Sequence, residues 1–560
     1  MRDLPRVTRI EITGYRSVRG PIAIDLPQGK PLILLGENNT GKSNIARAFE
    51  LVLGESWPKS HEPEDHEFWD RDPSGRPITI RVWFDNLQHT YRGTPYDVES
   101  LVWRYDQAAP SDACTFEYTL SNGTTCWASN ATREQLTSIT AGPQRQLAHQ
   151  LSYASKWTLL SKLMRRFHGR LTRDTARVTQ LETKFQEIQQ IFGGVNEFAT
   201  FQQELQGIVR TTLGGLPHGL EVDFSAYDPT NFFHSLRVAA KEGTTVRSFD
   251  EIGTGEEQLL MIAFARAYAR AFFGELVLII EEPEAHLHPQ AQRWLAGQIN
   301  SGAANWPQLI VTTHSPEFVD LLNLDGLVLV SKARGYTEAR QLSTPDLVSF
   351  CRNHGVSSPR LDAASILPHY VNASTLEIVS GLFARTVVLV EGQTEHLALP
   401  KFAERLGIDL VSKGIQVIPV MGKGNLAKWW RLFNAYGIGA YTIFDNDSSD
   451  DADQARRSDL LKSLKIEPDV ATSLIASSEW KIEPSFSIFG VDFETTLRGQ
   501  FPDYAALEAE AQQSIGSSKP LIARYVAANL PRDGSPGWNN LLLLFQNVLS
   551  QVACHCPACT

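Results

Sequence analysis

Residues 31–43 read Pro31-Leu-Ile-Leu-Leu-Gly-Glu-Asn-Asn-Thr-Gly-Lys-Ser43, and this stretch decides the fold of the first half of the chain. Its apolar run predicts a buried strand, and Gly36 to Ser43 satisfies the pattern G-x-x-x-x-G-K-[ST]. A helix is expected from Ser43 to Leu53, because its apolar residues fall on one stripe. Glycines let the backbone N–H groups of such a loop wrap phosphates at a helix N-terminus, so the unit predicts a nucleotide site.

The polar residues of this loop have distinct expected roles. Lys42 reaches the terminal phosphates of a nucleotide, and Ser43 can ligate Mg²⁺. A chance glycine loop is the alternative, but the strand before it and the helix after it are the context that phosphate binding requires. We therefore predict that ATP and Mg²⁺ bind here. The expected nucleotide-binding residues are Gly36, Asn39, Gly41, Lys42 and Ser43.

A second apolar strand, Leu276–Ile280, leads into Glu281-Glu-Pro-Glu-Ala-His-Leu-His-Pro289. Ligands gather at the carboxyl ends of strands in α/β sheets, and this arrangement resembles a Walker B motif. Glu281 would support Mg²⁺, and Glu282 would orient the attacking water. Two adjacent buried carboxylates would be costly to desolvate if they served structure alone.

Two further segments complete the first expected site. The strand Leu309–Thr313 ends at His314, which resembles the switch histidine that senses a γ-phosphate, although a lone histidine at a strand end is more often structural. Gly253 and Gly255 open a helix and resemble the ABC signature loop, which contacts ATP bound to the opposite subunit. The resemblance to SMC-like and DNA-repair ABC ATPases implies a homodimer or a higher homo-oligomer.

A second α/β unit begins at the apolar strand Thr386–Val390, followed by two acids four residues apart. The strand Tyr441–Phe444 then ends in Asp-Asn-Asp, whose two aspartates share one face of an extended segment. Such clustered carboxylates suit Mg²⁺ or Mn²⁺, and two ions can clamp the attacking and leaving oxygens of a phosphodiester. The alternative is a Rossmann-like sheet with ordinary acids at its strand ends. The four expected metal ligands are Glu391, Glu395, Asp445 and Asp447.

This second pattern resembles a Toprim domain. An ABC ATPase followed by a Toprim domain is similar to the OLD (overcoming lysogenization defect) family, which includes the nuclease subunit of Gabija anti-phage systems. The resemblance covers nearly the whole chain and is strongest at 9–53, 250–318 and 386–447. It implies a metal-dependent DNA endonuclease or nickase that an ATPase regulates, a role in anti-phage defence, and a helicase or reverse transcriptase as candidate partner.

The same resemblance implies a late acidic motif and a late lysine. Asp492 and Glu494 match the acidic motif as metal ligands, and Lys519 matches the lysine that stabilises charge on the phosphate. Asp492 could instead cap a helix, and Lys-Pro dipeptides are common. The expected catalytic residues are Glu391, Glu395, Asp445, Asp447, Glu494 and Lys519 in the Toprim domain and Glu282 in the ATPase domain.

The expected fold class is α/β throughout, with an ABC-type ATPase domain, a helical dimerisation insert and a C-terminal Toprim (Rossmann-like) domain. The change to sparse Gly and Pro after about residue 145 predicts a helical insert, and the resemblance to the OLD family implies its role in dimerisation. The expected boundaries are 1–144 and 211–341 for the ATPase domain, 145–210 for the insert, 342–385 for a helical connector and 386–560 for the Toprim domain.

Composition restricts the class of protein. No apolar run approaches the ~20 residues that span a bilayer, and the 560 residues include only six cysteines, so we expect a cytoplasmic protein without a membrane segment. A net charge of −11 does not exclude DNA, because a basic groove can coexist with an acidic total. A basic stretch at 165–177 could contact DNA but is more typical of a solvated helix face. Cys554, His555, Cys556 and Cys559 could bind zinc, although their spacing is cramped.

Two functions from different classes remain open at this point. The first is the ATP-regulated nuclease, and the second is a DNA-clamping ATPase whose Toprim domain only binds. Four mutually repelling acids favour the nuclease, because a binding module does not need them. A Toprim primase or topoisomerase is a more distant alternative, since neither a zinc module nor a nucleophilic-tyrosine context is visible.

Overall fold

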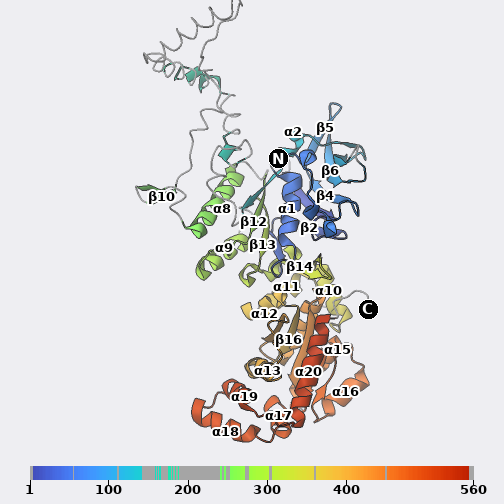
Figure 1. Cartoon of the computed structure of the whole chain (residues 1–560), viewed down its shortest axis with the longest axis vertical. Coiled ribbons are helices and arrows are strands. Elements are labelled where there is room, and N and C mark those ends of the chain that lie inside the picture. The colour runs from blue at the N-terminus through green and yellow to red at the C-terminus, as the bar shows by residue number, and fades with distance from the viewer. Residues whose placement is uncertain are drawn as a thin grey trace, which may run out of the picture. The chain divides into compact units, whose positions relative to one another are not determined.

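The computed structural model describes residues 4–141 except 55 and 110–112, isolated positions between 158 and 187, and 240–242, 245–247, 253–271, 276–301, 306–357, 361–447 and 451–553. The chain forms two compact units (Figure 1). One joins Met1–Thr140 to Phe272–Thr560, and the other is Ala141–Ala271. Most of the expected insert, four of the five arginines at 165–177, and the C-terminal Cys/His cluster lie outside the described residues.

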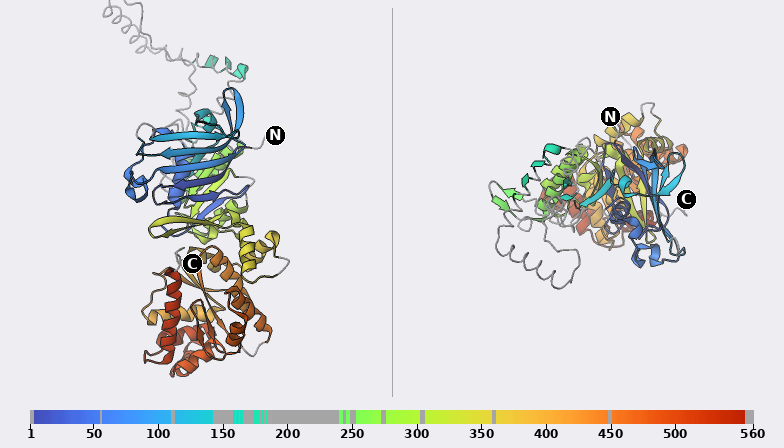
Figure 2. Two further views of the ribbon diagram at one scale, coloured as in Figure 1. Left: turned by 90° about the vertical axis from the view of Figure 1, so that its right-hand side faces the viewer. Right: turned by 90° about the horizontal axis from the view of Figure 1, so that it is seen from above.

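The first unit opens with an antiparallel sheet, whose blue strands lie side by side in the left panel of Figure 2. Its order is β2-β1-β4-β6-β7-β8, and β5 pairs with β6. In β4 buried and solvent-facing side chains alternate, as expected for a sheet with one covered face. The strands are β1 (Arg6–Thr13), β2 (Ile22–Asp25), β4 (Ile78–Asp85), β5 (Gln88–Tyr91), β6 (Thr94–Tyr105), β7 (Cys114–Leu120) and β8 (Thr125–Trp127).

A second, largely parallel sheet has the order β15-β14-β3-β13-β12-β9. Strands β14, β3, β13 and β12 run parallel, so the segments after β3, β13 and β12 emerge at one edge. Helix α1 (Lys42–Leu53) buries Ile45, Phe49 and Val52 in a core that includes residues of both sheets. The elements are β3 (Leu32–Leu35), β9 (Thr137–Ala141), β12 (Leu276–Glu281), β13 (Gln308–Thr313), β14 (Leu327–Ala333), β15 (Tyr336–Gln341), α2 (Asn130–Arg133) and α9 (Pro289–Ser301).

A helical segment follows the second sheet. It contains α10 (Thr344–Asn353), α11 (Ala363–Val371), α12 (Leu376–Ser380) and the 3-10 turn η8 (Gly381–Phe383). Ser343 and Asp346 form a capping box at the start of α10, which satisfies backbone N–H groups that a helix end leaves unpaired.

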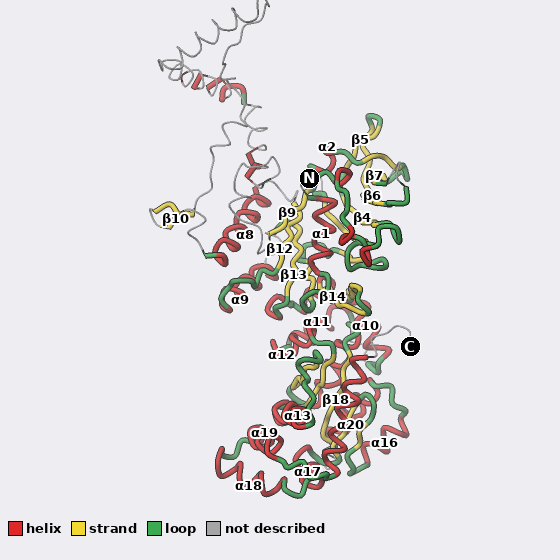
Figure 3. The backbone as a smooth tube through the Cα atoms, in the orientation of Figure 1, coloured by secondary structure: helices red, strands yellow, loops and turns green. Residues whose placement is uncertain are grey.

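The third sheet has the order β17-β16-β18-β20-β19 and is parallel from β17 to β20. In Figure 3 its yellow strands lie among red helices, of which α13 packs against α19. The carboxyl ends of β17, β16, β18 and β20 therefore share one edge. The strands are β16 (Thr386–Val390), β17 (Ile415–Pro419), β18 (Gly439–Asp445), β19 (Lys481–Ile482) and β20 (Phe486–Phe489). The helices are α13 (Gln393–Arg405), α14 (Leu426–Ala435), α15 (Asp451–Ser463), α16 (Pro468–Ala476), α17 (Phe493–Gln500), α18 (Tyr504–Ile515), α19 (Lys519–Asn529) and α20 (Pro536–Ala553).

The second unit contains the hairpin β10 (Ala240–Glu242) and β11 (Thr245–Arg247) and the long helix α8 (Thr254–Ala271). The helix expected after Gly253 is thus present. Within the described part of the chain, none of the helices combines the length and apolar character that a bilayer crossing demands.

Candidate functional site

The loop between β3 and α1 holds a conformation that its glycines permit. Gly36 has φ of 152° and Gly41 has φ of 108°, which L side chains rarely adopt. A Cβ on Gly41 would lie 2.1 Å from Oγ1 of Thr337 on β15. Thr337 in turn donates to the Thr40 carbonyl at 2.7 Å, so β15 supports the loop from behind.

The side chain of Lys42 lies folded into this loop. Its ammonium donates to the carbonyl oxygens of Gly36 at 2.9 Å and Glu37 at 2.8 Å, and lies 3.1 Å from Nδ1 of His314. Burial lowers the Lys42 pKa to about 8, against the opposing effect of nearby carboxylates led by Glu282. The lysine therefore occupies a position from which it can turn towards a bound phosphate.

His314 joins the three adjacent strand ends of this sheet. Its Nε2 lies 3.0 Å from Glu282, which follows β12, and its Nδ1 lies 2.9 Å from the Gly36 carbonyl, which follows β3. Glu282 has φ of 49°, a strained value of the kind found at functional sites. His314 thus contacts both Lys42 and Glu282, while Glu281 ends β12 and Ser43 lies in the first turn of α1.

Glu284 is a residue of this site that the sequence analysis did not assign. Its Oε1 accepts from the His314 backbone N–H at 2.6 Å and from the Thr313 hydroxyl at 2.8 Å. It therefore fixes the segment that carries the histidine. The acidic string after β12 contained this signal, but only the fold places Glu284 beside β13.

Gly253 and Gly255 belong to the second unit. Gly253 immediately precedes α8, and Gly255 lies in its first turn. The contact with a nucleotide that the resemblance implies remains a prediction.

The third sheet brings the second set of acids together. Oε1 of Glu391, after β16, accepts from the backbone N–H of Asp445 at the end of β18 at 2.7 Å. The side chain of Glu395, in the first turn of α13, accepts from the Gly392 N–H at 3.2 Å. Asp447 has φ of 40°, another strained position.

The electrostatics of these acids confirm their proximity. Burial is the largest cause that raises the pKa of Glu391, to about 7, and the charges of Glu395 and Asp447 add to it. Burial likewise raises the Asp445 pKa well above its ordinary value, with contributions from Glu391, Glu395 and Asp447. Burial also raises the Glu395 pKa, with a contribution from Glu494. Five carboxyls therefore repel one another at one sheet edge.

These acids fit a divalent cation, although they do not form a finished cage. Oδ1 of Asp445 is buried without a hydrogen-bond partner, which is the state expected of a ligand oxygen in the absence of its cation. Among the described residues, no three carboxyl, imidazole or thiol groups stand together in a ligand arrangement. Asp447 instead pairs with Lys423, whose ammonium lies 2.8 Å from Oδ2.

Lys423 is a second residue to which the sequence analysis assigned no role. It lies in the turn η9 (Lys423–Asn425) after β17, and its side chain is only 2% exposed. Its ammonium also lies 3.6 Å from Glu391. The sequence showed a glycine turn at 422–425, but not that the lysine enters the acid cluster.

The late residues differ in placement. Glu494 lies in the first turn of α17, near Glu395. Asp492 caps α17 by accepting from the Thr495 N–H at 2.6 Å, which is the alternative that the sequence left open. Lys519 begins α19 and is exposed, and in the described part of the chain no hydrogen bond or ion pair joins it to the acids. Among the described lysines, Lys423 lies within contact distance of the acids.

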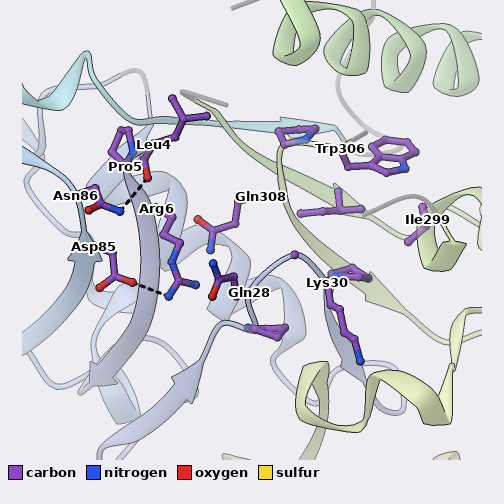
Figure 4. Close-up of a pocket in the computed structure, with 15 residues that line it drawn as sticks. Leu4, Pro5, Arg6, Gln28, Lys30, Asp85, Asn86, Ile299, Trp306 and Gln308 are labelled. Atoms are coloured by element: carbon purple, nitrogen blue, oxygen red, sulfur yellow. Dashed lines mark hydrogen bonds and ion pairs between the residues drawn. The ribbon is translucent and has the colours of Figure 1, made fainter. Parts of the chain in front are cut away.

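A pocket of about 430 Å³ lies at the opposite edge of the second sheet, near the amino ends of β3 and β13 (Figure 4). Arg6 pairs with Asp85 at 2.5 Å, and Lys30 donates to the Leu322 carbonyl at 2.6 Å. Gln308 exchanges hydrogen bonds with the backbone of Val7. Because these polar groups already have protein partners, the pocket is not a candidate for the nucleotide or nuclease chemistry.

Two family models match the chain. The model described as "AAA domain, putative AbiEii toxin, Type IV TA system" matches residues 32–320. The model described as "Overcoming lysogenization defect protein-like, TOPRIM domain" matches residues 382–447.

Two curated proteins are similar to this chain. It is 27% identical over 464 residues to a protein named OLD nuclease from Thermus scotoductus (strain ATCC 700910 / SA-01), an alignment that covers 78% of this chain and 81% of that protein. It is 30% identical over 172 residues to the Old nuclease of Escherichia phage P2, which covers 30% of this chain and 28% of the phage protein.

Solved structures resemble parts of the chain more weakly. The Smc head domain of Pyrococcus furiosus, bound to the C-terminal domain of ScpA, matches with a TM-score of 0.36 and 17% identity, over 62% of this chain and 99% of that one. The C-terminal region of the Xanthomonas campestris pv. campestris OLD protein matches with a TM-score of 0.25 and 17% identity, over 30% of this chain and 94% of that one.

Proposed function

We propose that this chain, which belongs to the family described as "AAA domain, putative AbiEii toxin, Type IV TA system", is an ATP-regulated, metal-dependent DNA endonuclease or nickase. The model of that family spans more than half of the 560 residues, and the chain also carries an OLD-like Toprim domain. The curated relatives that are named OLD nucleases support the assignment to the nucleases.

One observation carries the proposal of metal-dependent cleavage. Carboxyls from β16, β18 and α17 converge at one edge of the Toprim sheet, and a buried oxygen of Asp445 has no protein partner. A structural role does not account for such repulsion, because removing an unpaired carboxylate from water costs on the order of several kcal/mol. A divalent cation offsets this cost, and oxygen donors suit Mg²⁺ or Mn²⁺.

The residues divide the work as follows. Glu391, Glu395, Asp445 and Asp447 would hold the metal ions, and Glu494 would complete the ligand set beside Glu395. Bound metal would supply activation of water and stabilisation of charge on the scissile phosphate. Asp492 serves as a helix cap, and we retain Lys519 only as a candidate group that reaches the DNA when DNA is bound.

The ATPase residues support nucleotide-dependent control of cleavage. Lys42 and Ser43 would bind the phosphates and Mg²⁺, Glu281 would support the ion, Glu282 would orient water, and His314 would sense the γ-phosphate. The 3-10 turn η6 (Pro316–Phe318), which begins two residues after His314, packs against α12.

A second contact continues from α12 towards the nuclease acids. Glu377 of α12 lies 3.1 Å from Nε2 of His396, and His396 directly follows Glu395 on α13. A movement at His314 therefore has a packed route to a nuclease acid. Such a route transmits regulation only if ATP binds two conformations with different affinities.

The proposal also covers the oligomeric state of the protein and its biological role. An ABC-type site that is completed by Gly253 and Gly255 of another subunit would make the protein a homodimer or a higher homo-oligomer. We extend the proposal to anti-phage defence in the cytoplasm, with a helicase or reverse transcriptase as the class of partner, because the Toprim domain is OLD-like.

Cleavage of a supercoiled plasmid tests the central claim. With Mg²⁺ or Mn²⁺, wild type should nick or linearise the plasmid, and Asp445→Asn should lower the rate roughly 100-fold or more, because it removes a charged metal ligand. ATP binding should be unchanged. The matched control is Asp503→Asn, an exposed position before α18 whose side chain caps no backbone group.

Undiminished cleavage by Asp445→Asn would exclude this site as the nuclease centre. A wild-type protein that binds DNA in an ATP-dependent manner but never cleaves it would instead be a clamping ATPase with a non-cleaving Toprim domain.

A further inference from the structure

Lys423 reaches the nuclease acids from a third strand end. The loop after β17 is held to β16, because Val420 N–H donates to the Val390 carbonyl at 2.9 Å and Gly422 N–H donates to the Glu391 carbonyl at 2.8 Å. The same backbone that presents Glu391 thus fixes the position of Lys423.

The loop adopts a strained conformation to achieve this placement. Met421 has φ of 57° and Gly422 has φ of 115°, and Nδ2 of Asn425 closes the turn on the Val420 carbonyl at 2.9 Å. Strained turns of this kind persist where the surroundings determine them, and they concentrate at functional sites. The result is an ammonium whose side chain is 2% exposed, 2.8 Å from Asp447 and 3.6 Å from Glu391.

Burying a lysine side chain is unfavourable, because its charged ammonium group loses its hydration. Taking an ammonium group out of water costs on the order of several kcal/mol unless it is paired with an acid. In the described part of the chain, two of its partners are acids that would bind metal, and these acids follow β16 and β18, on one side of β17. The ammonium therefore lies where a cation is needed while metal is absent.

We propose that Lys423 is the resident counter-ion of the nuclease site, a positioning residue that holds Asp447 and Glu391 in the metal-free protein and competes with the divalent cation for Asp447. This inference rests on the proposed function, since it takes these acids as the metal ligands. A metal ion that uses Oδ2 of Asp447 must displace the ammonium, so the lysine sets the metal concentration at which the site loads.

The proposal predicts the sign of a binding change. In Lys423→Met, the acids lose their internal cation but keep their own charge, and Mn²⁺ should bind at least about tenfold more tightly. A merely structural lysine would have the opposite effect, because a disordered site binds metal more weakly. The metal-free variant should also unfold at a lower temperature than wild type, and saturating Mn²⁺ should remove most of that difference.

The experiment is a Mn²⁺ titration of the full chain by electron paramagnetic resonance at one pH, without nucleotide or DNA. Asp445→Asn supplies the background for ions bound elsewhere. The control is Lys401→Met on α13, which removes a surface lysine paired with Glu404 and should leave the affinity at the wild-type value. In an Asp447→Asn background, Lys423→Met should change the affinity much less, because the contested carboxylate is gone.

Each outcome decides the matter. A folded Lys423→Met protein with unchanged or weaker Mn²⁺ binding overturns the inference, and so does a variant that stays unfolded with and without Mn²⁺. If wild type binds no Mn²⁺ above the Asp445→Asn background, the proposed function and the inference fail together. If Lys423→Met binds more tightly but wild type never cleaves DNA, only the proposed nuclease activity fails.

Discussion

Glu391 shows how one buried carboxyl links stability to pH. Burial raises its pKa from 4.5 to about 7. Between these values the folded protein binds more protons than the unfolded chain, so stability falls as pH rises. The loss from this group is on the order of 3 kcal/mol in the metal-free protein.

We therefore expect the unfolding temperature in EDTA to fall from pH 5 to pH 7, and Glu391→Gln to make that slope shallower. Saturating Mg²⁺ should oppose the loss, because the metal binds the ionised form. Thermal unfolding at several pH values measures both effects, with Glu404→Gln on the exposed side of α13 as control. Parallel slopes for wild type and Glu391→Gln would contradict the assignment of the raised pKa to this carboxyl.

At the scale of elements, the phosphate-binding loop depends on β15 as much as on its own glycines. Gly41 combines φ of 108° with a neighbour, Thr337 Oγ1, that a Cβ would approach to 2.1 Å. That hydroxyl is already bonded to the Thr40 carbonyl and lies 2.7 Å from Ser17, so it has little freedom to move.

Gly41→Ala should thus cost about 1–3 kcal/mol of stability and lower ATP affinity at least tenfold, because the backbone N–H groups that cradle phosphate are displaced. Fluorescent-nucleotide titration and thermal unfolding measure the two effects. Gly335→Ala is the control, since Gly335 also has positive φ, in the β14–β15 turn, but an added Cβ meets nothing there. Equal ATP affinity in the two variants would mean that the contact with Thr337 is unimportant.

For the whole molecule, the question is whether the two sites act on each other. Two residues separate nucleotide binding from hydrolysis in this test: Lys42 should bind the phosphates, and Glu282 should orient the attacking water. ATP titrated against plasmid cleavage should change the wild-type rate, leave Lys42→Ala flat, and hold Glu282→Gln at the ATP-bound level. The direction of the change is left to the measurement, because the residues suit an activating and an inhibiting nucleotide equally.

Glu282→Gln with ATP should also accumulate the closed oligomer, which light scattering detects as a gain in mass if closure joins two chains. Three superimposable, flat cleavage curves would mean that the ATPase and the nuclease are uncoupled. An unchanged mass with ATP would count against a site completed by Gly253 and Gly255 of a second subunit.

The sequence by itself determined the order of the domains and the identity of most candidate residues. Apolar runs predicted β3, β16 and the buried part of β12 to within about one residue, because a strand buried on both faces consists almost entirely of apolar residues. The motifs at 36–43 and 281–289 indicated an ATPase domain and the motif at 391–395 indicated an OLD-like Toprim domain, and the family models confirm both domains. These signals are local, since each lies within one strand–loop–helix unit.

Only the tertiary structure decided which side chains from different units meet. Glu284 contacts the backbone of His314 because β12 and β13 are neighbours in the sheet, and Lys423 contacts Asp447 because β17 and β18 flank β16. Neither contact can be predicted from the spacing of residues along the chain, because the order of strands in the sheet depends on how the sheet buries its faces. The same reason explains why, in the described part of the chain, Lys423 contacts the acids from a glycine turn to which sequence analysis gave no role.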